Sequence, residues 1–260
     1  MKTDSNIIVF IAACCMVFSV SAQGAIDSTG IKLLESWKTK QAQEFFESEI
    51  RKNPRDAEAH YYLAGALQRQ GKSDEAEDAI DEALEINENV SKYHYLRGAI
   101  LGDRALKTNR LKQAILAPRI KRAFLRSVEL DPSNIDGHIG LFNYYMQAPG
   151  IMGGSEEKGF EEANKVLSLN PYRGHQMLAG YYARVRKDAT KAEEEFRKMT
   201  EADPKNRDGY FRYGMFLVHE KKTDQAMTEF NKMLAIDPRS AETNFLYGRA
   251  LFSMDQWDKA

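Results

Sequence analysis

The residues of this chain best suited to acid–base chemistry or metal binding are its five histidines and two clusters of glutamates. His60, His94 and His138 stand at the same place in three successive stretches of the sequence. Metal ligands must converge on one point. Side chains that recur once in each successive stretch are instead spread along the chain with the structural repeat. We therefore interpret these three histidines as packing residues, while His175 and His219 have no close partner in the sequence and stay unassigned.

The remaining reactive groups give no catalytic pattern. Residues 156–157 and 193–195 are glutamates that we expect on exposed helix faces, and no Gly-x-Ser-x-Gly nucleophile motif occurs. Both cysteines, Cys14 and Cys15, lie in an N-terminal apolar run, so the chain after it has no thiol for catalysis, disulfides or metal binding. The sequence predicts a protein that is not an enzyme and has no metal or cofactor. An enzyme with a site spread over distant residues is the remaining catalytic hypothesis.

The elements that position these side chains are marked by proline. Five of the seven prolines end helical stretches at one place of a repeating unit, as in the sequence Glu-Leu-Asp-Pro at 129–132. These five are Pro54, Pro132, Pro171, Pro204 and Pro238. The last two are 34 residues apart, and a fixed period of this size indicates stacked supersecondary units.

Residues 207–240 serve as the type unit. Large side chains at Tyr210, Tyr213 and Leu217 share one helical face, and a second apolar face follows after a short polar turn at 221–223. The unit is therefore predicted to be a helix–turn–helix pair. A glycine inside a helix costs about 1 kcal/mol relative to alanine, so we interpret Gly214 as a point where two helices approach closely.

Units 57–90 and 207–240 resemble the tetratricopeptide repeat, a 34-residue pattern of large and small residues. The positions that match in the first of these units are His60, Leu63, Ala64, Leu67, Gly71, Ala76, Ile80 and Ala83. The resemblance implies an all-α fold, a right-handed superhelical solenoid of antiparallel helix pairs that follows an N-terminal signal peptide. The expected divisions are a linker and half-repeat at 23–56, units at 57–90, 91–134, 135–173, 174–206 and 207–240, and an incomplete unit at 241–260.

The resemblance also implies that the first helix of each unit lines a concave groove, which binds an extended protein or peptide. The groove residues carried over to this chain are Tyr61, Arg69, Tyr95, Asn143, Met177, Tyr181, Arg184, Phe211, Met215, Phe245 and Arg249. The alternative is that several of these rings pack between helices. Some relatives grip a carboxylate with paired Lys and Asn residues, but Ile139 stands where that lysine would be, beside Asn143. We do not expect such a clamp here.

Two insertions interrupt the period, and both fall between the two helices of a pair, so we expect them side by side on one edge of the stack. The first has eight basic and no acidic residues between 104 and 128, with Pro118 expected in the first turn of the second helix. Its basic residues, named here the basic edge, are Arg104, Lys107, Arg110, Lys112, Arg119, Lys121, Arg122 and Arg126. The basic edge either binds an acidic partner, a phosphate-bearing ligand or anionic lipid, or is neutralised by glutamates of adjacent units.

The second insertion, residues 147–155, is a loop rich in proline and glycine, with Ile151 and Met152 at its tip. Ser155 is expected to cap the next helix, followed by two glutamates in its first turn. A P-loop would need a lysine that this segment lacks. We predict a structural or contact loop.

Residues 1–22 are predicted to form a secretory signal peptide, because a lysine precedes a 14-residue apolar run that ends at Val20-Ser21-Ala22. An uncleaved membrane anchor and a lipoprotein site at Cys14 are the alternatives. The mature protein is expected in the periplasm or outside the cell, with no membrane span. The net charge of −1 implies neither nucleic-acid nor membrane binding.

The last unit stops at Ala260, near the start of its second helix. Stacked repeats normally need a polar capping unit, so we expect a fragment or a second chain against this end. The sequence thus predicts a non-enzymatic scaffold that binds a protein or peptide in its concave groove. The alternative is a scaffold that self-associates through the basic edge and the incomplete C-terminal repeat.

Overall fold

The structure, a computed structural model, describes residues 28–253, which form thirteen α-helices, two short helices of other types and no strand. The predicted signal peptide and the last residues of the final unit lie outside the described residues. The helices are α1 (Ser28–Glu35), α2 (Thr39–Lys52), α3 (Ala57–Arg69), α4 (Ser73–Ile86), α5 (Ser91–Leu106), α6 (Arg110–Leu130), α7 (Ile135–Gln147), η1 (3₁₀, Gly150–Met152), α8 (Glu156–Leu169), α9 (Pro171–Tyr181), η2 (π, Tyr182–Arg186), α10 (Ala189–Ala202), α11 (Arg207–His219), α12 (Thr223–Ile236) and α13 (Ala241–Ser253).

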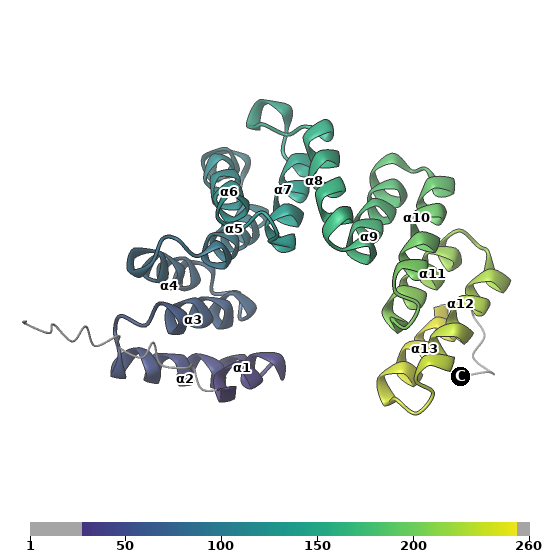
Figure 1. Cartoon of the computed structure of the whole chain (residues 1–260), viewed down its shortest axis with the longest axis horizontal. Helices are drawn as coiled ribbons and strands as arrows, with labels where there is room; N and C mark the ends of the chain where they lie inside the picture. Colours follow the sequence, from purple (N-terminus) through teal and green to yellow (C-terminus); the bar gives the residue numbers. More distant parts are fainter. Residues whose placement is uncertain (1–27, 254–260) are drawn as a thin grey trace, which may run out of the picture.

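The helices form antiparallel pairs that stack side by side into a curved array, with α1 and α2 at one end and α13 at the other (Figure 1). Contacts run within a pair or between adjacent pairs. First helices of adjacent pairs also meet, as α3 meets α5 and α5 meets α7, whereas second helices make no comparable contact. The first helices therefore line the inner side of the curve. The predicted all-α solenoid of helix pairs is confirmed.

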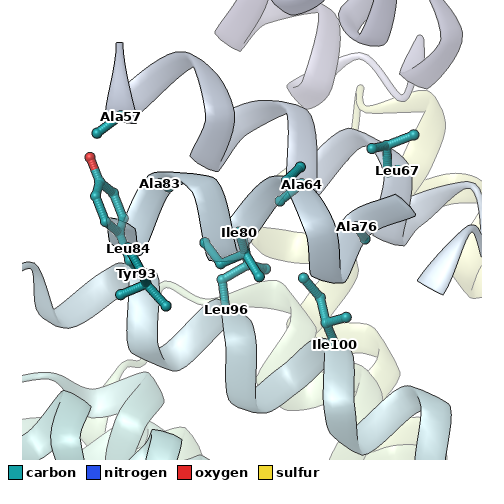
Figure 2. Packing of buried hydrophobic residues seen from close by; sticks show 11 residues of the cluster. Ala57, Ala64, Leu67, Ala76, Ile80, Ala83, Leu84, Tyr93, Leu96 and Ile100 are labelled. Carbon is teal, nitrogen blue, oxygen red and sulfur yellow. The ribbon is translucent and has the colours of Figure 1, made fainter. Parts of the chain in front are cut away.

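Each core cluster joins one pair to the next instead of filling a common centre. Figure 2 shows the cluster in which Ala64 of α3, Ile80 of α4 and Ile100 of α5 meet, all fully buried. Small residues such as Ala76 and Ala83 allow the helix axes to approach, while the larger side chains fill the space between them. Every pair thus depends on its neighbour to cover its apolar face.

Glycines at the same repeat position in two pairs mark close approaches, as predicted. A Cβ on Gly98 would lie 2.6 Å from the Phe124 ring, and one on Gly214 would overlap the Phe230 ring. The sequence also aligns Gly180 with Gly98 and Gly214, but the structure shows that this alignment is wrong. The fully buried Ala179 takes that place in the fourth pair, because this pair begins earlier than the sequence suggested.

The fourth pair corrects two further expectations. Pro171 does not end a helical stretch but is the first residue of α9, so the expected division between residues 173 and 174 falls inside that helix. The other four prolines of the set lie in turns between pairs. The reason is Asn170, which ends α8 and also caps α9 by accepting a hydrogen bond from the Arg173 amide at 3.0 Å.

The three histidines that recur with the repeat have a structural role. The Nε2 atom of His60 lies 3.1 Å from the Pro54 carbonyl oxygen, and that of His138 lies 3.0 Å from the Pro132 carbonyl oxygen. His94 makes the same contact, at 2.7 Å, with the carbonyl oxygen of Glu88. In each case the ring closes the turn that leads into its own helix.

The first insertion lengthens both helices of its pair, and the expected place of Pro118 is wrong. Helix α6 begins at Arg110, where the Asn109 side chain accepts a hydrogen bond from the Lys112 amide at 3.0 Å. Pro118 therefore lies in the interior of a 21-residue helix, where it removes one backbone hydrogen bond. Helix α5 has 16 residues, compared with 13 in α3.

The second insertion forms the loop that contains η1, and Ser155 caps α8 through the amide of Lys158 at 3.3 Å. Both expectations for this segment's cap and loop are confirmed. The loop contacts α6, so the two insertions are neighbours on one edge, as predicted.

Candidate binding surfaces

A pocket of about 360 Å³ lies on the inner side of the curve, where α5 and α7 meet above α6. Two predicted groove residues, Tyr95 and Asn143, lie in its wall together with Ile139. Both insertions contribute as well, because Leu106 and Met152 close the pocket at the edge. The structure thus brings part of the predicted groove and the two insertions into one site.

Three glycines shape this pocket. Gly98 and Gly140 lie against the Phe124 ring, which occupies the space that their side chains would need. Gly102 differs, because a Cβ placed there would have no heavy atom within 4 Å. The hollow therefore has an aromatic floor and an open wall at Gly102.

The polar groups of the pocket are mostly uncharged. Burial, and next the nearby Asp136 carboxylate, raise the pKa of Tyr95, so its phenol stays protonated near neutral pH. The single carboxylate in the wall, Asp103, accepts a hydrogen bond from Gln68 at 2.8 Å. Asn143 and Gln147 add amide groups at the rim. Such a lining suits the binding of an apolar group by shape, with a few hydrogen bonds to orient it.

The predicted groove residues nearer the N-terminus take part in packing within the chain. The Tyr61 ring stacks on the Tyr93 ring with centroids 5.2 Å apart. Burial raises the pKa of Tyr61 to about 12. The guanidinium of Arg69 donates to the Leu34 carbonyl oxygen at 2.5 Å and lies 5.3 Å from the Trp37 ring centroid. Arg69 thereby fastens the end of α1 to α3.

One predicted groove residue is placed differently. Tyr181 is 4% exposed, its ring meets the Phe160 ring edge-on at 4.9 Å, and its hydroxyl donates to Glu156. It packs between helices and does not line an open surface, so that expectation is wrong. Met177 is half-buried against the same cluster, and Arg184 is exposed within η2.

Predicted groove residues of the last pairs gather around Arg249. Its guanidinium carbon lies 5.6 Å from the Phe211 ring centroid and 6.0 Å from that of Phe245. Phe245 is 65% exposed, and Met215 is half-buried beside Phe211 in the adjoining core. This aromatic and basic group lies on α11 and α13, far along the chain from the pocket at α5 and α7.

The basic edge divides into paired and unpaired cations. Glu77 of α4 forms ion pairs with Arg104 at 2.5 Å and with Arg119 at 2.6 Å. These two cations of the basic edge are therefore paired with a glutamate of the adjacent unit, which was one of the two interpretations of the sequence. Arg126 pairs with Glu129, and the ammonium of Lys121 lies 5.4 Å from the Tyr145 ring centroid. The cations of the basic edge that form no ion pair with another described residue are Lys107, Arg110, Lys112, Lys121 and Arg122.

Two histidine–glutamate pairs, one buried and one half-buried, escaped the sequence analysis. His138 Nδ1 lies 2.6 Å from a Glu162 oxygen, and His175 Nδ1 lies 2.7 Å from a Glu195 oxygen. His175 thus takes the repeat position of the other histidines, one helix pair after His138. The signal was present in the Gly-His dipeptides at 137–138 and 174–175, but the misplaced unit boundary concealed it.

The hydrogen bond to Glu162 outweighs burial and raises the pKa of His138. Burial alone would raise the pKa of Glu162, but hydrogen bonds from His138 and Lys165 prevail and lower it. Both shifts favour the charged forms, a histidinium beside a carboxylate. Since both ring nitrogens of His138 face oxygen acceptors, the charged imidazolium satisfies both contacts.

A curved array of helix pairs with a recessed inner face defines a helical-repeat solenoid, a class of scaffold for protein interactions. Among residues 28–253, no three His, Cys, Asp or Glu side chains converge as a metal site would require. Within the same range, no helix is long and apolar enough to cross a membrane.

The tetratricopeptide-repeat family profiles match residues 33–100 and 177–241, together about half of the chain, and the chain belongs to this superfamily. Proteins of this superfamily bind protein or peptide partners and are generally non-enzymatic scaffolds. A search of curated proteins finds no match.

Solved structures with this fold include a thermophilic tetratricopeptide-repeat protein of Thermus thermophilus, with 18% identity and a TM-score of 0.64 over 76% of this chain and 100% of that one. A chain of the APC/C hetero-tetramer Cut9–Hcn1 has 17% identity and a TM-score of 0.56, over 86% of this chain and 42% of that one. The human IFIT1 dimer with PPP-AAAA has 16% identity and a TM-score of 0.57, over 80% of this chain and 53% of that one. At these identities the likeness concerns the fold.

Proposed function

We propose that this chain is an exported, non-enzymatic scaffold that binds an extended protein or peptide along the inner side of its curve. The pocket between α5, α6 and α7 receives a bulky apolar side chain of the partner. The observation that carries this proposal is the pocket itself, whose floor is the Phe124 ring and whose wall opens at Gly102.

The pocket has the size and chemistry of an anchor site. A volume of about 360 Å³ falls in the range of small-molecule pockets, so a single aromatic or large aliphatic side chain fits. Backbone and side-chain amides of the partner would meet Asn143 and Gln147 at the rim. Export is supported by the N-terminal apolar run and the absence of cysteine after residue 15.

Gly102→Leu tests the proposal, because it fills the pocket from a position where a side chain meets open space. The probe is a displayed library of random peptides, selected for binding to the full chain. We expect the selected peptides to share a bulky apolar residue and to bind Gly102→Leu at least tenfold more weakly than the wild type.

Gly65→Leu is the matched control. Gly65 lies on the first helix of the previous pair, is also open to added atoms, and does not line the pocket. Peptides that bind all three proteins equally would place their site elsewhere. A selection that enriches no peptide would refute peptide binding on this face.

Self-association is the second candidate function. The observation in its favour is that Phe245 and Phe252 of α13 are 65% and 57% exposed. Sedimentation of the full chain at increasing concentration tests it, and a constant monomer mass would exclude it.

A further inference from the structure

The tips of two neighbouring hairpins expose large apolar side chains. Leu106 and Leu111, at the tip between α5 and α6, are each 74% exposed, and Ile115 on the second turn of α6 is 63% exposed. Ile151, at the tip between α7 and α8, is 96% exposed. The two tips adjoin, since η1 contacts α6 and since Leu106 and Met152 border the same pocket.

The tip between α5 and α6 extends beyond its neighbours. Helix α5 is three residues longer than α3, and α6 is seven residues longer than α4. At about 1.5 Å per residue, the added lengths are roughly 5 and 10 Å. A surface that meets this edge of the solenoid therefore meets the α5–α6 tip first, with the α7–α8 tip beside it.

The apolar side chains alternate with cations that have no internal partner. Lys107, Arg110 and Lys112 flank Leu106 and Leu111, and none of the three forms an ion pair with another described residue. Of the glutamates that follow the second tip, Glu156 is paired with Arg186 at 3.2 Å. The tips thus combine positive charge with projecting apolar groups.

This combination fits a lipid surface better than a protein groove. Leu111 and Ile115 lie one turn apart on α6, Ile151 lies on the other tip, and all three are largely exposed, so a protein partner would need a recess for each tip. The headgroup region of a bilayer accepts such side chains without matched recesses, and the phosphates of anionic lipids attract lysine and arginine.

We propose that the α5–α6 and α7–α8 tips form a peripheral docking surface for anionic lipid bilayers. Leu111, Ile115 and Ile151 enter the headgroup region, while Lys107, Arg110 and Lys112 contact lipid phosphates. This surface lies beside the inner pocket, and none of these six residues lines the pocket.

Vesicle flotation of the full chain tests the proposal, with vesicles of phosphatidylcholine alone or with about 30% phosphatidylglycerol. We expect binding to the anionic vesicles that weakens between about 0.05 M and about 0.5 M salt. At roughly fivefold for each cation, the variant K107Q/R110Q/K112Q should bind about a hundredfold more weakly. The double variant Leu111→Ser with Ile151→Ser should also bind more weakly, with its salt dependence retained.

The matched control is R55Q/K205Q/R239Q, which removes the same charge from three exposed positions, each directly after a proline in a turn between pairs. All variants keep the same N-terminal segment, so its contribution cancels, and Gly102→Leu should bind vesicles like the wild type. An equal loss in the control would show general charge attraction and overturn the proposal. Binding to a soluble peptide of alternating Glu and Leu, with none to anionic vesicles, would assign the tips to an acidic protein instead.

Discussion

Replacing Tyr210 by histidine should stabilise the α11–α12 pair. Glu162, Glu195 and Glu229 are each the seventh residue of the second helix in their pairs. A histidine of the first helix faces Glu162 and another faces Glu195. In the pair that contains Glu229, the position of that histidine is occupied by Tyr210. As a result, Glu229 Oε2 is buried without a hydrogen-bond partner among residues 28–253.

The expected gain follows from that oxygen. Leaving a buried acceptor without a partner costs about 1–3 kcal/mol, and a hydrogen bond to a charged group contributes about 1.5–3 kcal/mol. The substitution removes the cation–π contact of the Tyr210 ring with the Lys232 ammonium, which lies 6.0 Å from the ring centroid. Such a contact contributes about 0.5–1 kcal/mol. The Tyr210 hydroxyl bond to the Pro204 carbonyl oxygen, at 3.2 Å, is replaced by the ring contact seen at His60 and His138. The net gain should be roughly 1 kcal/mol.

This gain should depend on pH in a defined direction. As at His138, the carboxylate should hold the pKa of the new histidine above its value in the unfolded chain. The stabilisation is then complete below about pH 6.5, the ordinary histidine pKa, and is lost as pH rises through the folded value. At pH 9 the variant should show little of it.

Hydrogen exchange of α11 and α12 amides is the suitable assay, because it reports the local opening of this pair. At pH 6, exchange in Tyr210→His should be slowed about fivefold relative to the wild type. Adding Glu229→Gln should abolish the difference. If Tyr210→His differed from the wild type by the same protection at pH 6 and at pH 9, the assigned role of Glu229 would be refuted. Faster exchange in the variant than in the wild type at pH 6 would also refute it.

Three further predictions concern stability. Gly214→Ala should lower the free energy of unfolding by about 1–3 kcal/mol, because the added methyl group would overlap the Phe230 ring. Gly102→Ala should raise the free energy of unfolding by up to about 1 kcal/mol, because alanine favours the helix and meets open space there. Urea denaturation compares the two variants. Lys221 has φ of 59°, in the left-handed region that favours glycine, so Lys221→Gly should slow the exchange of nearby amides, consistent with a gain of up to about 1 kcal/mol. His138→Gln should destabilise the protein more at pH 6 than at pH 9, because the raised pKa of His138 gives stability that is lost as pH rises; thermal unfolding at the two values checks the sign.

The sequence predicted the repeated pairs well because prolines and small residues follow the period. It misplaced Pro118, since a proline in the first turn of a helix and one in its interior leave the same local pattern, and the Asn109 cap decides between them. It misplaced Tyr181 because the residues around it do not reveal the Phe160 ring that covers it. The predicted division at 173 failed because Asn170 shortens the turn.

The candidate pocket was less accessible to sequence analysis. Tyr95 and Asn143 were among the predicted groove residues, but only the structure shows that both insertions close the same hollow. Gly98 and Gly102 look alike in the sequence, although one lies against an aromatic ring and the other faces open space. Pairing of Arg104 and Arg119 with Glu77 likewise depends on the geometry between pairs.

Contacts confined to adjacent pairs have a mechanical consequence for the curved array. The array can bend at each junction between adjacent pairs. Small rotations at successive junctions add up at the two ends, while each junction alone remains stiff. A short ligand at α5 and α7 restrains a single junction. A ligand long enough to reach from there to α13 restrains several at once, so the length of a partner sets how rigid the whole chain becomes.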